Sequence, residues 1–357
     1  MQKQIFCVIC LVLILGGQAF AIETTLPDEL IRASPEAAEL LDMDDTTGYG
    51  LIHGAVTLFQ SAFADAKQYL FAGVRAVAAI MAGVVLLGMV ESLTPDSTVT
   101  SHTTIIGALW ITAMSAGDMN TLIGLGQGTI TKISEFSKLL LPVIGAATAA
   151  GGGVTSASVR QIGTVFFSDI LMTIMERLLL PMLHIYIGIS AAGAVLEDGA
   201  FEKIGGLLKK SITGILSVFL ILFTTYLTIS GAIAGSTDAQ AVRIAKTTVS
   251  TVVPVVGGIL SEAAESILAG AGLLKGMVGV FGTFAILAMC LVPFLRLGAQ
   301  YLLYHAASLV AQMVGPPKLT KLLSMLGDAF ALVLAMTGAA ALLLLISLVS
   351  TLTAVVV

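Results

Sequence analysis

Long runs of apolar residues, separated by short polar connections, make up most of the chain after residue 70. Each run reaches the roughly 20 residues that a helix needs to cross the hydrocarbon core of a bilayer. Such runs form helices, because unpaired backbone groups are strongly disfavoured in lipid. The pattern predicts an all-α, polytopic membrane protein. Its expected spans are Phe71–Leu93, Thr103–Leu125, Gly163–Val195, Ser211–Gly235, Gly276–Ala299 and Phe330–Leu352.

Two further apolar stretches, Leu139–Val154 and Val252–Gly272, are short, contain a proline near their start and are rich in glycine. Irregular backbone at membrane depth is tolerated where protein or a wet cavity satisfies it, so we expect discontinuous or re-entrant hairpins. The alternative is two ordinary, short transmembrane helices. The residues expected to shape the hairpins are Pro142, Gly151, Gly152, Gly153, Pro254, Gly257 and Gly258.

The same proline spacing occurs twice. Pro254 and Pro293 follow Pro142 and Pro181 at one common interval of about 112 residues, and the apolar flanks agree. We therefore expect an internal duplication, in which each copy is a Pro/Gly-rich hairpin plus two spans. The first copy would cover 137–238 and the second 239–357, after two transmembrane helices in 71–136.

Composition supports this class and sets the N-terminus apart. Hydrophobic residues are 57% of the chain, charged residues are 11% and the mean hydropathy is +1.01, whereas soluble domains carry about 25% charged residues. Residues 1–21 are predicted to be a signal peptide, with an uncleaved membrane anchor as the alternative. The acidic segment 22–70 is expected outside the cytoplasm. Its charge gives no support for nucleic-acid binding.

Basic residues favour one arrangement of the two copies. Lys203, Lys209 and Lys210 precede one span, and Lys318 and Lys321 precede the matching span of the second copy. If each copy has a hairpin and two full spans, both basic loops lie on the cytoplasmic side, as the positive-inside rule requires. If the hairpins cross fully, the loops fall on opposite sides.

Ionisable residues inside a predicted span are the main candidates for function. Asp169, Glu176, Arg177 and His184 fall within one arc of a helical wheel, and such side chains at membrane depth normally face a partner or a water-filled cavity. We interpret them as lining a pathway or contacting a partner. The alternative is a neutralised structural cluster in which Arg177 pairs with carboxylates. Glu262 and Glu265, in the second copy, are further candidates for an interface or a cavity.

Enzyme signatures are missing from the sequence. There is no zinc-binding H-E-x-x-H helix, no G-x-S-x-G elbow and no GxGxxG dinucleotide loop. The four histidines show no metal-ligand spacing. The sequence therefore predicts no enzyme activity, no catalytic residue, no metal site and no cofactor.

Two strings carry a family resemblance: L-L-P-V-x-x-A-x-x-A-x-G-G-G-V-T-S-A from Leu140, and R-I-A-K-T-T-V-S-x-x-V-P-V-V-G-G-x-L-S-E-A from Arg243. With them, the chain resembles the stage III sporulation protein AE family of endospore-forming bacteria over nearly its whole length. The resemblance implies a multi-pass subunit of the channel apparatus that links the mother cell to the engulfed forespore. It also implies a location in the mother-cell membrane around the forespore and a role in forespore development.

The resemblance further implies partners. These are the other stage III sporulation A-operon proteins, including ring subunits and a secretion-type ATPase, and indirectly stage II sporulation protein Q. Membrane lipid would surround the chain. A non-enzymatic channel subunit is the leading hypothesis; the alternatives are an autonomous secondary transporter of small molecules and a non-conducting membrane scaffold for the complex.

Overall fold

The computed structural model describes residues 28–35, 48–93, 97–196, 199–252 and 257–352. The predicted signal peptide, most of the acidic segment ahead of Gly48, and Pro254 lie outside these residues. In the described part the helices are α2 (Asp28–Ala33), α4 (Gly48–Leu93), α5 (Ser97–Ala150), α6 (Val154–Ile174), the π-helical turn η1 (Met175–Leu179), α7 (Leu180–Val195), α8 (Ala200–Val252), α9 (Gly257–Val314) and α10 (Pro317–Leu352).

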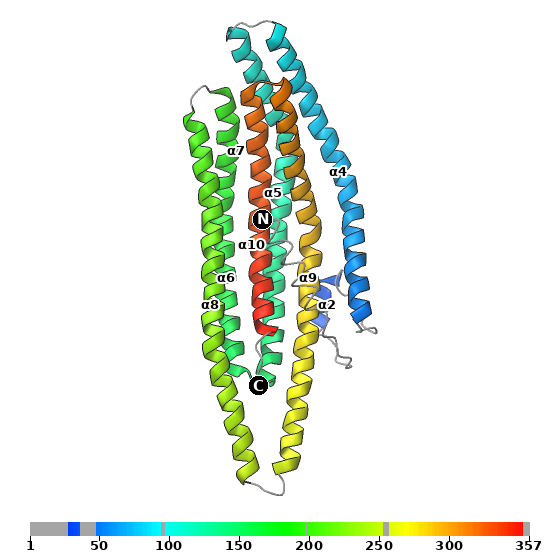
Figure 1. Ribbon diagram of the computed structural model, residues 1–357, viewed down its shortest axis with the longest axis vertical. Coiled ribbons are helices and arrows are strands. Elements are labelled where there is room, and N and C mark those ends of the chain that lie inside the picture. The colour runs from blue at the N-terminus through cyan, green and yellow to red at the C-terminus, as the bar shows by residue number, and fades with distance from the viewer. Residues whose placement is uncertain (1–27, 36–47, 94–96, 197–198, 253–256, 353–357) are drawn as a thin grey trace.

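The long helices run alternately up and down in one elongated bundle, with α6, η1 and α7 together forming a single crossing (Figure 1). Six crossings are long and apolar enough to span a membrane: Val56–Leu93, Thr100–Ala150, Ala157–Val195, Ala200–Ser230, Gly272–Val314 and Pro317–Leu352. Each contains one of the six spans expected from the sequence, or nearly all of it. The prediction of an all-α, polytopic membrane protein is confirmed.

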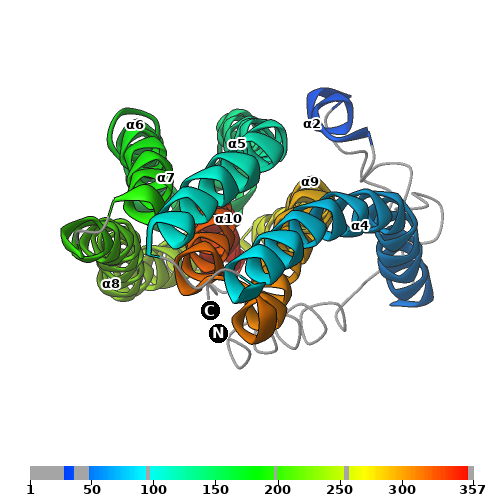
Figure 2. The same ribbon diagram turned by 90° about the horizontal axis from the view of Figure 1, so that it is seen from above.

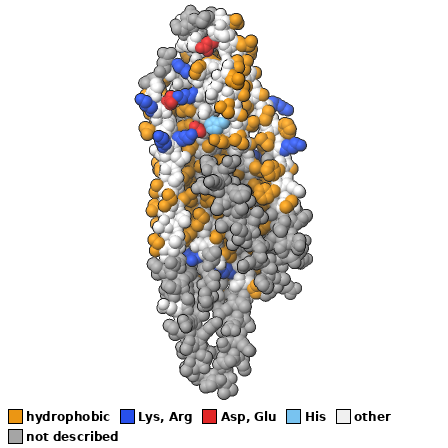
Figure 3. Space-filling model, in the orientation of Figure 1, with side chains coloured by type: hydrophobic (Ala, Val, Ile, Leu, Met, Phe, Trp, Pro, Cys, Tyr) orange, Lys and Arg blue, Asp and Glu red, His pale blue; other side chains and the backbone are white. Residues whose placement is uncertain are grey.

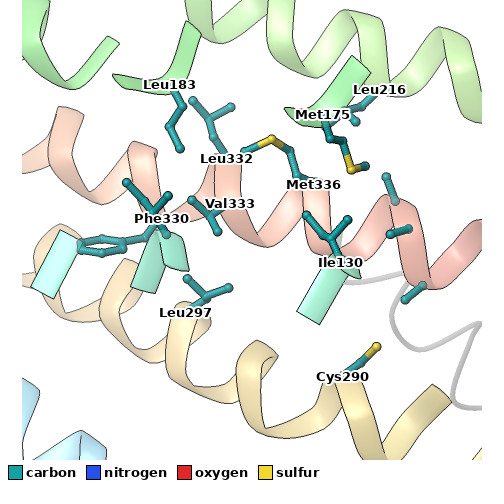
Figure 4. Close-up of a cluster of buried hydrophobic side chains, with 14 of the residues drawn as sticks. Ile130, Met175, Leu183, Leu216, Cys290, Leu297, Phe330, Leu332, Val333 and Met336 are labelled. Carbon is teal, nitrogen blue, oxygen red and sulfur yellow. The ribbon is translucent and has the colours of Figure 1, made fainter. Parts of the chain in front are cut away.

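Helix α10 is the centre of the bundle. It packs against α5, α7, α8 and α9, which surround it when the molecule is seen from above (Figure 2). Its apolar residues continue around the whole helix, as expected of a helix that is buried on all sides. Phe330, Val333 and Met336 of α10 lie in one buried cluster with side chains from the surrounding helices, among them Ile130 of α5, Leu183 of α7 and Leu297 of α9 (Figure 4).

Helix α5 differs from the sequence expectation. It runs without a break from Ser97 to Ala150, through Pro142. The segment 139–154 is therefore the end of a full-length helix and the turn into α6, rather than a separate, short re-entrant hairpin. Packing of Leu140, Leu141 and Ile144 in the core holds the helix together around the proline, whose missing N–H would weaken an isolated helix.

The glycines after α5 form a tight C-terminal cap. Gly153 donates its N–H to Thr148 O at 3.0 Å, and Gly152 donates to Ala149 O at 3.0 Å. This is the Schellman pattern, and Gly152 occupies the left-handed position with φ 88°. A residue with a Cβ would be strained there. The triple glycine therefore lets α6 fold back directly against α5.

The two basic segments lie at the same end of the bundle. Lys209 Nζ of α8 lies 2.7 Å from Asp328 of α10, and Lys321 of α10 pairs with Glu202 of α8. The starts of α8 and α10 therefore share one end, as expected from the charges. The reason is the expected pair of full crossings in each proposed copy, and it does not require a re-entrant hairpin.

The internal duplication stays a prediction. At the proposed interval, α6–α7 would correspond to α9 and α8 to α10, and Pro181 and Pro293 both lie inside a crossing. The expected copy boundary between residues 136 and 137 falls inside α5. Helical crossings in both halves are expected of any polytopic helical membrane protein, so they do not test whether the two copies arose by duplication.

Candidate functional site: a polar face at membrane depth

The apolar part of α10 gives a measure of membrane depth. From Ala329 to Thr351 it contains no ionisable residue, a length of about 34 Å at 1.5 Å per residue, close to one hydrocarbon core. Neighbouring helices are placed against it by close contacts. Gly126 of α5 packs on Val333 of α10. Leu140 of α5 and Leu348 of α10 both pack on Gly282 of α9. The Thr164 hydroxyl of α6 shares a hydrogen bond with Ser347.

The predicted ionisable stripe lies at this depth and faces outward. Met175, beside Glu176, lies close to Met336, near the middle of the apolar part of α10, in one buried cluster (Figure 4). Asp169, Glu176, Arg177 and His184 are all exposed. Within a single chain they therefore face away from the bundle interior, where an internal pathway would have to lie.

Local backbone geometry contributes to this exposure. Pro181 has no N–H to donate, and the chain ahead of it widens into the π-turn, where Leu180 donates its N–H to Met175 O. Residues 176, 177 and 178 are consecutively exposed, and the irregular turn ends two residues ahead of Pro181. Such π-turns are frequent at functional sites.

Among the described residues, no ion pair joins Arg177 to a carboxylate. The one hydrogen bond found for a side chain of the stripe is His184 Nδ1 with Leu180 O at 2.8 Å, inside its own helix. The interpretation of a neutralised cluster around Arg177 therefore has no support in this part of the chain. A charged side chain at the bilayer centre costs about 3 kcal/mol on an insertion scale, so three such charges facing lipid would be unfavourable.

Helix α5 carries a second polar stripe that the sequence reading missed. Its exposed polar side chains recur at helical spacing within the same range of depth: Asn120, Thr121, Gln127, Lys132, Glu135 and Lys138. The expected span ended at Leu125 and the next apolar stretch began at Leu139, so 126–138 belonged to no expected span. The recurrence of polar residues at three- and four-residue spacing, with no helix breaker before Pro142, is the signal that could have revealed it.

The two stripes share one side of the molecule. Helix α5 packs against α6 and α7, and Gly145 lies beside Gln161 across that contact. We call this surface the outer polar face; it consists of the six polar residues of α5 given above together with Asp169, Thr173, Glu176, Arg177 and His184. Its fixed charges are three positive, from Lys132, Lys138 and Arg177, and three negative, from Glu135, Asp169 and Glu176.

A different surface is seen in Figure 3. There most of the Lys, Arg, Asp and Glu side chains gather toward one end of the bundle, and the described surface below them is mainly apolar or uncharged, with basic side chains again farther down. This is the distribution expected of a face that contacts lipid. The outer polar face departs from it, which is why we treat that face as the candidate functional surface.

Polar contacts between helices gather nearer the basic end. Asp328 accepts from Lys209 and lies 3.5 Å from His305, Gln300 donates to Asp118 at 3.2 Å, and the Tyr304 hydroxyl donates to Ser115 at 2.8 Å. The Arg296 guanidinium stacks 3.3 Å above the Tyr69 ring. These contacts join α4, α5, α8, α9 and α10 and hold the bundle in one arrangement.

Two cavities open at this basic end. One, of about 320 Å³, lies around Gln312, Gly315 and Ser324; the other, of about 270 Å³, lies between α7, α8 and α10 around Ser190, Glu202 and Met325. Both are lined by Lys321. The described residues contain no group of His, Cys, Asp and Glu suited to hold a metal ion.

The remaining sequence candidates are less informative. Glu262, Glu265, Gly257 and Gly258 belong to α9, but their side-chain surroundings fall outside the described part of the structure. Whether the two glutamates contribute to an interface stays a prediction.

Comparison with known proteins identifies the family. Residues 48–355 match the family described as stage III sporulation protein AE. Over 231 residues the chain is 22% identical to the stage III sporulation protein AE of Bacillus subtilis (strain 168), a match that covers 65% of this chain and 58% of that protein. No solved structure matches the chain. The resemblance read from the strings around Pro142 and Pro254 is thereby confirmed, and the chain belongs to the stage III sporulation protein AE family.

Proposed function

We propose that this protein is a non-enzymatic, multi-pass membrane subunit of a sporulation-specific channel or secretion-like complex that links mother cell and forespore. Membership of the stage III sporulation protein AE family and the six apolar crossings support the proposal. The proposed location is the mother-cell membrane around the engulfed forespore, and the proposed contribution is to forespore development.

The observation that carries the subunit role is the outer polar face. Six fixed charges at membrane depth face away from the bundle, whereas charges in membrane proteins almost always face protein or water. A chain that worked alone in lipid would expose all of them to acyl chains. A chain in an assembly has a neighbour or a water-filled passage there, which favours the subunit over an autonomous transporter.

The proposed partners are those of the family. They are the other stage III sporulation A-operon proteins, namely ring subunits and a secretion-type ATPase, and indirectly stage II sporulation protein Q. The two basic segments at one end of the bundle would lie in the mother-cell cytoplasm by the positive-inside rule, where an ATPase could contact them.

Deleting the gene in the source organism tests the sporulation role. We expect loss of heat-resistant spores and of late forespore reporter expression, with both restored by the wild-type copy. A functional fluorescent fusion should gather on the membrane around the engulfed forespore. Normal spore yield after deletion, or a fusion spread evenly over vegetative membranes, would refute the proposal.

Replacing Asp169, Glu176 and Arg177 together by Ala separates a pathway from a scaffold. Loss of forespore expression with normal recovery of partners would indicate a pathway at the outer polar face, whereas loss of partner recovery would indicate a contact surface. The control replaces three exposed hydroxyl residues of α8, Ser217, Thr224 and Thr228, by Ala and should have neither effect. Transport by the purified chain alone would favour the autonomous transporter.

A further inference from the structure

Arg160 of α6 is a cation enclosed by the bundle. The residue is 8% exposed, and in the described part of the structure its Nε and Nη1 atoms have no hydrogen-bond partner. Arg296 also has such a nitrogen, but its guanidinium is stacked on the Tyr69 ring. An arginine near a membrane boundary normally extends its charge toward water or the lipid headgroups. Arg160 instead keeps its charge inside the protein.

Contacts with α10 give the depth of Arg160. Thr164, one turn farther along α6, shares a hydrogen bond with Ser347 of α10, and the two helices run in opposite directions (Figure 1). Arg160 is therefore about 6 Å nearer the end of α10 and level with Thr351. The apolar part of α10 ends at this level, so Arg160 lies at the membrane boundary opposite to the basic segments, where the polar headgroup region begins.

A second cation lies close to Arg160. Lys275 of α9 is near enough for its ammonium and the Arg160 guanidinium to repel each other. Gly279, one turn farther along α9, packs on Leu352 of α10, so Lys275 lies about 6 Å beyond the end of α10. Two positive charges therefore lie close together beside the last turn of α10. Their repulsion adds to the cost of burying Arg160.

The surrounding helices supply no carboxylate at this level. No Asp or Glu occurs in the nearest stretches of α6, α9 and the helices packed against them, which are 48–64, 136–168, 203–237, 266–327 and 329–352. Along α6 the first carboxylate is that of Asp169, which is exposed and about 13 Å away along the axis. The C-terminus of α10 offers a partial negative charge of about half a unit, too little for two full positive charges. The counter-charge must come from outside these helices.

The pair is accessible from the side of α9. Lys275 is half-buried, and Gly272 and Gly276 beside it are exposed. A Cβ added at either glycine would meet nothing within 4 Å, so no other described part of the chain covers the backbone of α9 here. An anionic group can therefore approach Lys275 from outside the bundle.

We propose that Arg160 and Lys275 form a phosphate-binding site at the membrane boundary opposite to the basic segments. The planar guanidinium matches two phosphate oxygens, and the lysine ammonium adds a point charge. Phosphate is the anionic group that lipids present at this depth, and basic pockets between transmembrane helices bind lipid headgroups. One bound phosphate would give the unpartnered nitrogens of Arg160 their acceptors and neutralise the pair. The site does not depend on the proposed sporulation role, because it concerns a ligand of the single chain.

Thermal unfolding of the purified full-length chain in mild detergent tests the site. Dioleoyl phosphatidylglycerol should raise the unfolding midpoint, whereas dioleoyl glycerol, with the same acyl chains and no phosphate, should not. Arg160→Gln should lower the affinity for phosphatidylglycerol by about tenfold or more, because it removes the charged fork. Lys210→Gln, at an exposed lysine of the opposite end, is the control and should leave the affinity unchanged. Equal responses of the wild type and Arg160→Gln would overturn the proposal.

Two further variants keep the test decisive if Arg160→Gln does not fold. Arg160→Lys retains the charge without the fork and should bind phosphatidylglycerol with intermediate affinity. Lys275→Gln, at a half-buried position, should lower the affinity severalfold. Wild-type affinity in both variants would overturn the proposal. Native mass spectrometry provides a readout besides stability: the wild type should retain a phospholipid that Lys275→Gln loses.

Inorganic phosphate, titrated without lipid, distinguishes the two sources of the group. Stabilisation by phosphatidylglycerol but not by inorganic phosphate would assign a lipid headgroup. Stabilisation by inorganic phosphate that is lost in Arg160→Gln would assign free phosphate, and either result supports the site. Potassium chloride at the same ionic strength is the control, and an equal effect of chloride would overturn selectivity for phosphate.

The acidic N-terminal segment is the rival source of a counter-charge, because it is expected outside the cytoplasm, on the side where Arg160 lies by the positive-inside rule. A chain with this segment neutralised carries Glu36→Gln, Glu39→Gln, Asp42→Asn, Asp44→Asn and Asp45→Asn. It should bind phosphatidylglycerol as the wild type does. Binding that depends on Arg160 only after this neutralisation would assign the site to the acidic segment and overturn the proposal.

Discussion

Near the basic end, single polar residues join several helices of the bundle. Asp328 is the most connected of them, since it faces Lys209 of α8 and His305 of α9 from α10. Gly327, its neighbour, leaves the space that the His305 ring occupies. One carboxylate therefore joins three helices that are distant in sequence.

Replacing Asp328 by Asn should destabilise the fold, because Lys209 and His305 lose their shared counter-charge. We expect a loss of about 1.5–3 kcal/mol, the range for hydrogen bonds to charged groups. The measurement is thermal unfolding of the purified chain in detergent. Lys203→Ala, at an exposed lysine of the same segment, is the control, and equal effects of both changes would argue against the contact.

Gly126 makes the approach of α5 to α10 possible. A Cβ at this position would collide with the Val333 side chain. We expect Gly126→Ala to destabilise by about 1–3 kcal/mol through overpacking. Gly214→Ala, where the added methyl group meets nothing, should instead stabilise slightly because alanine is the better helix former. If Gly126→Ala and Gly214→Ala both stabilise the protein, the result contradicts close packing of α5 on α10 at Gly126.

At the scale of elements, the crossing built from α6, η1 and α7 determines where its charges point. The extra residue in the π-turn rotates α7 relative to α6 compared with a regular helix. Asp169 lies before the turn, His184 after it, and Glu176 and Arg177 within it. The helical wheel drawn from the sequence placed these side chains in one arc, but a wheel does not show whether that arc faces the bundle or its outside.

Replacing Pro181 by Ala should let the π-turn relax into regular helix, because residue 181 could then donate its N–H to residue 177. Relaxation of the π-turn would rotate the exposed face of α7 relative to the exposed face of α6. Spin labels at Phe166 and Ile185, both exposed, should report a changed distance. Labels at Ser158 and Phe166, both ahead of the turn, are the control, and an unchanged 166–185 distance would show that proline does not cause the turn.

At the scale of the whole molecule, the structure predicts which ends of the helices share a membrane side. Lys203 and Gln312 lie beside the two basic segments at one end, and Val154 lies at the turn between α5 and α6 at the other. Cysteines at 203 and 312 should react with a membrane-impermeant maleimide from one side of the membrane, and a cysteine at 154 from the opposite side. Labelling of 203 and 312 from opposite sides would contradict the six-crossing bundle.

The sequence predicted the number and approximate positions of the crossings, because burial in lipid requires long apolar segments whatever they pack against. It also placed the two basic segments at one end. It misjudged 139–154, since Pro and Gly are reliable breakers in isolation but not where packing around Leu140 and Ile144 compensates.

The family and the membrane class of this protein were determined by its sequence alone, because apolar runs and two motif strings are local properties of the chain. The direction in which its charges face was decided only by tertiary structure. Asp169, Glu176 and Arg177 were visible as ionisable residues in a span, and Lys132, Glu135 and Lys138 were not recognised as lying in one. Only the continuity of α5 and its contact with α6 and α10 brought both sets to one outward face. The reason is physical: a sequence fixes which side chains share a helix face, but neighbouring helices decide which face is covered.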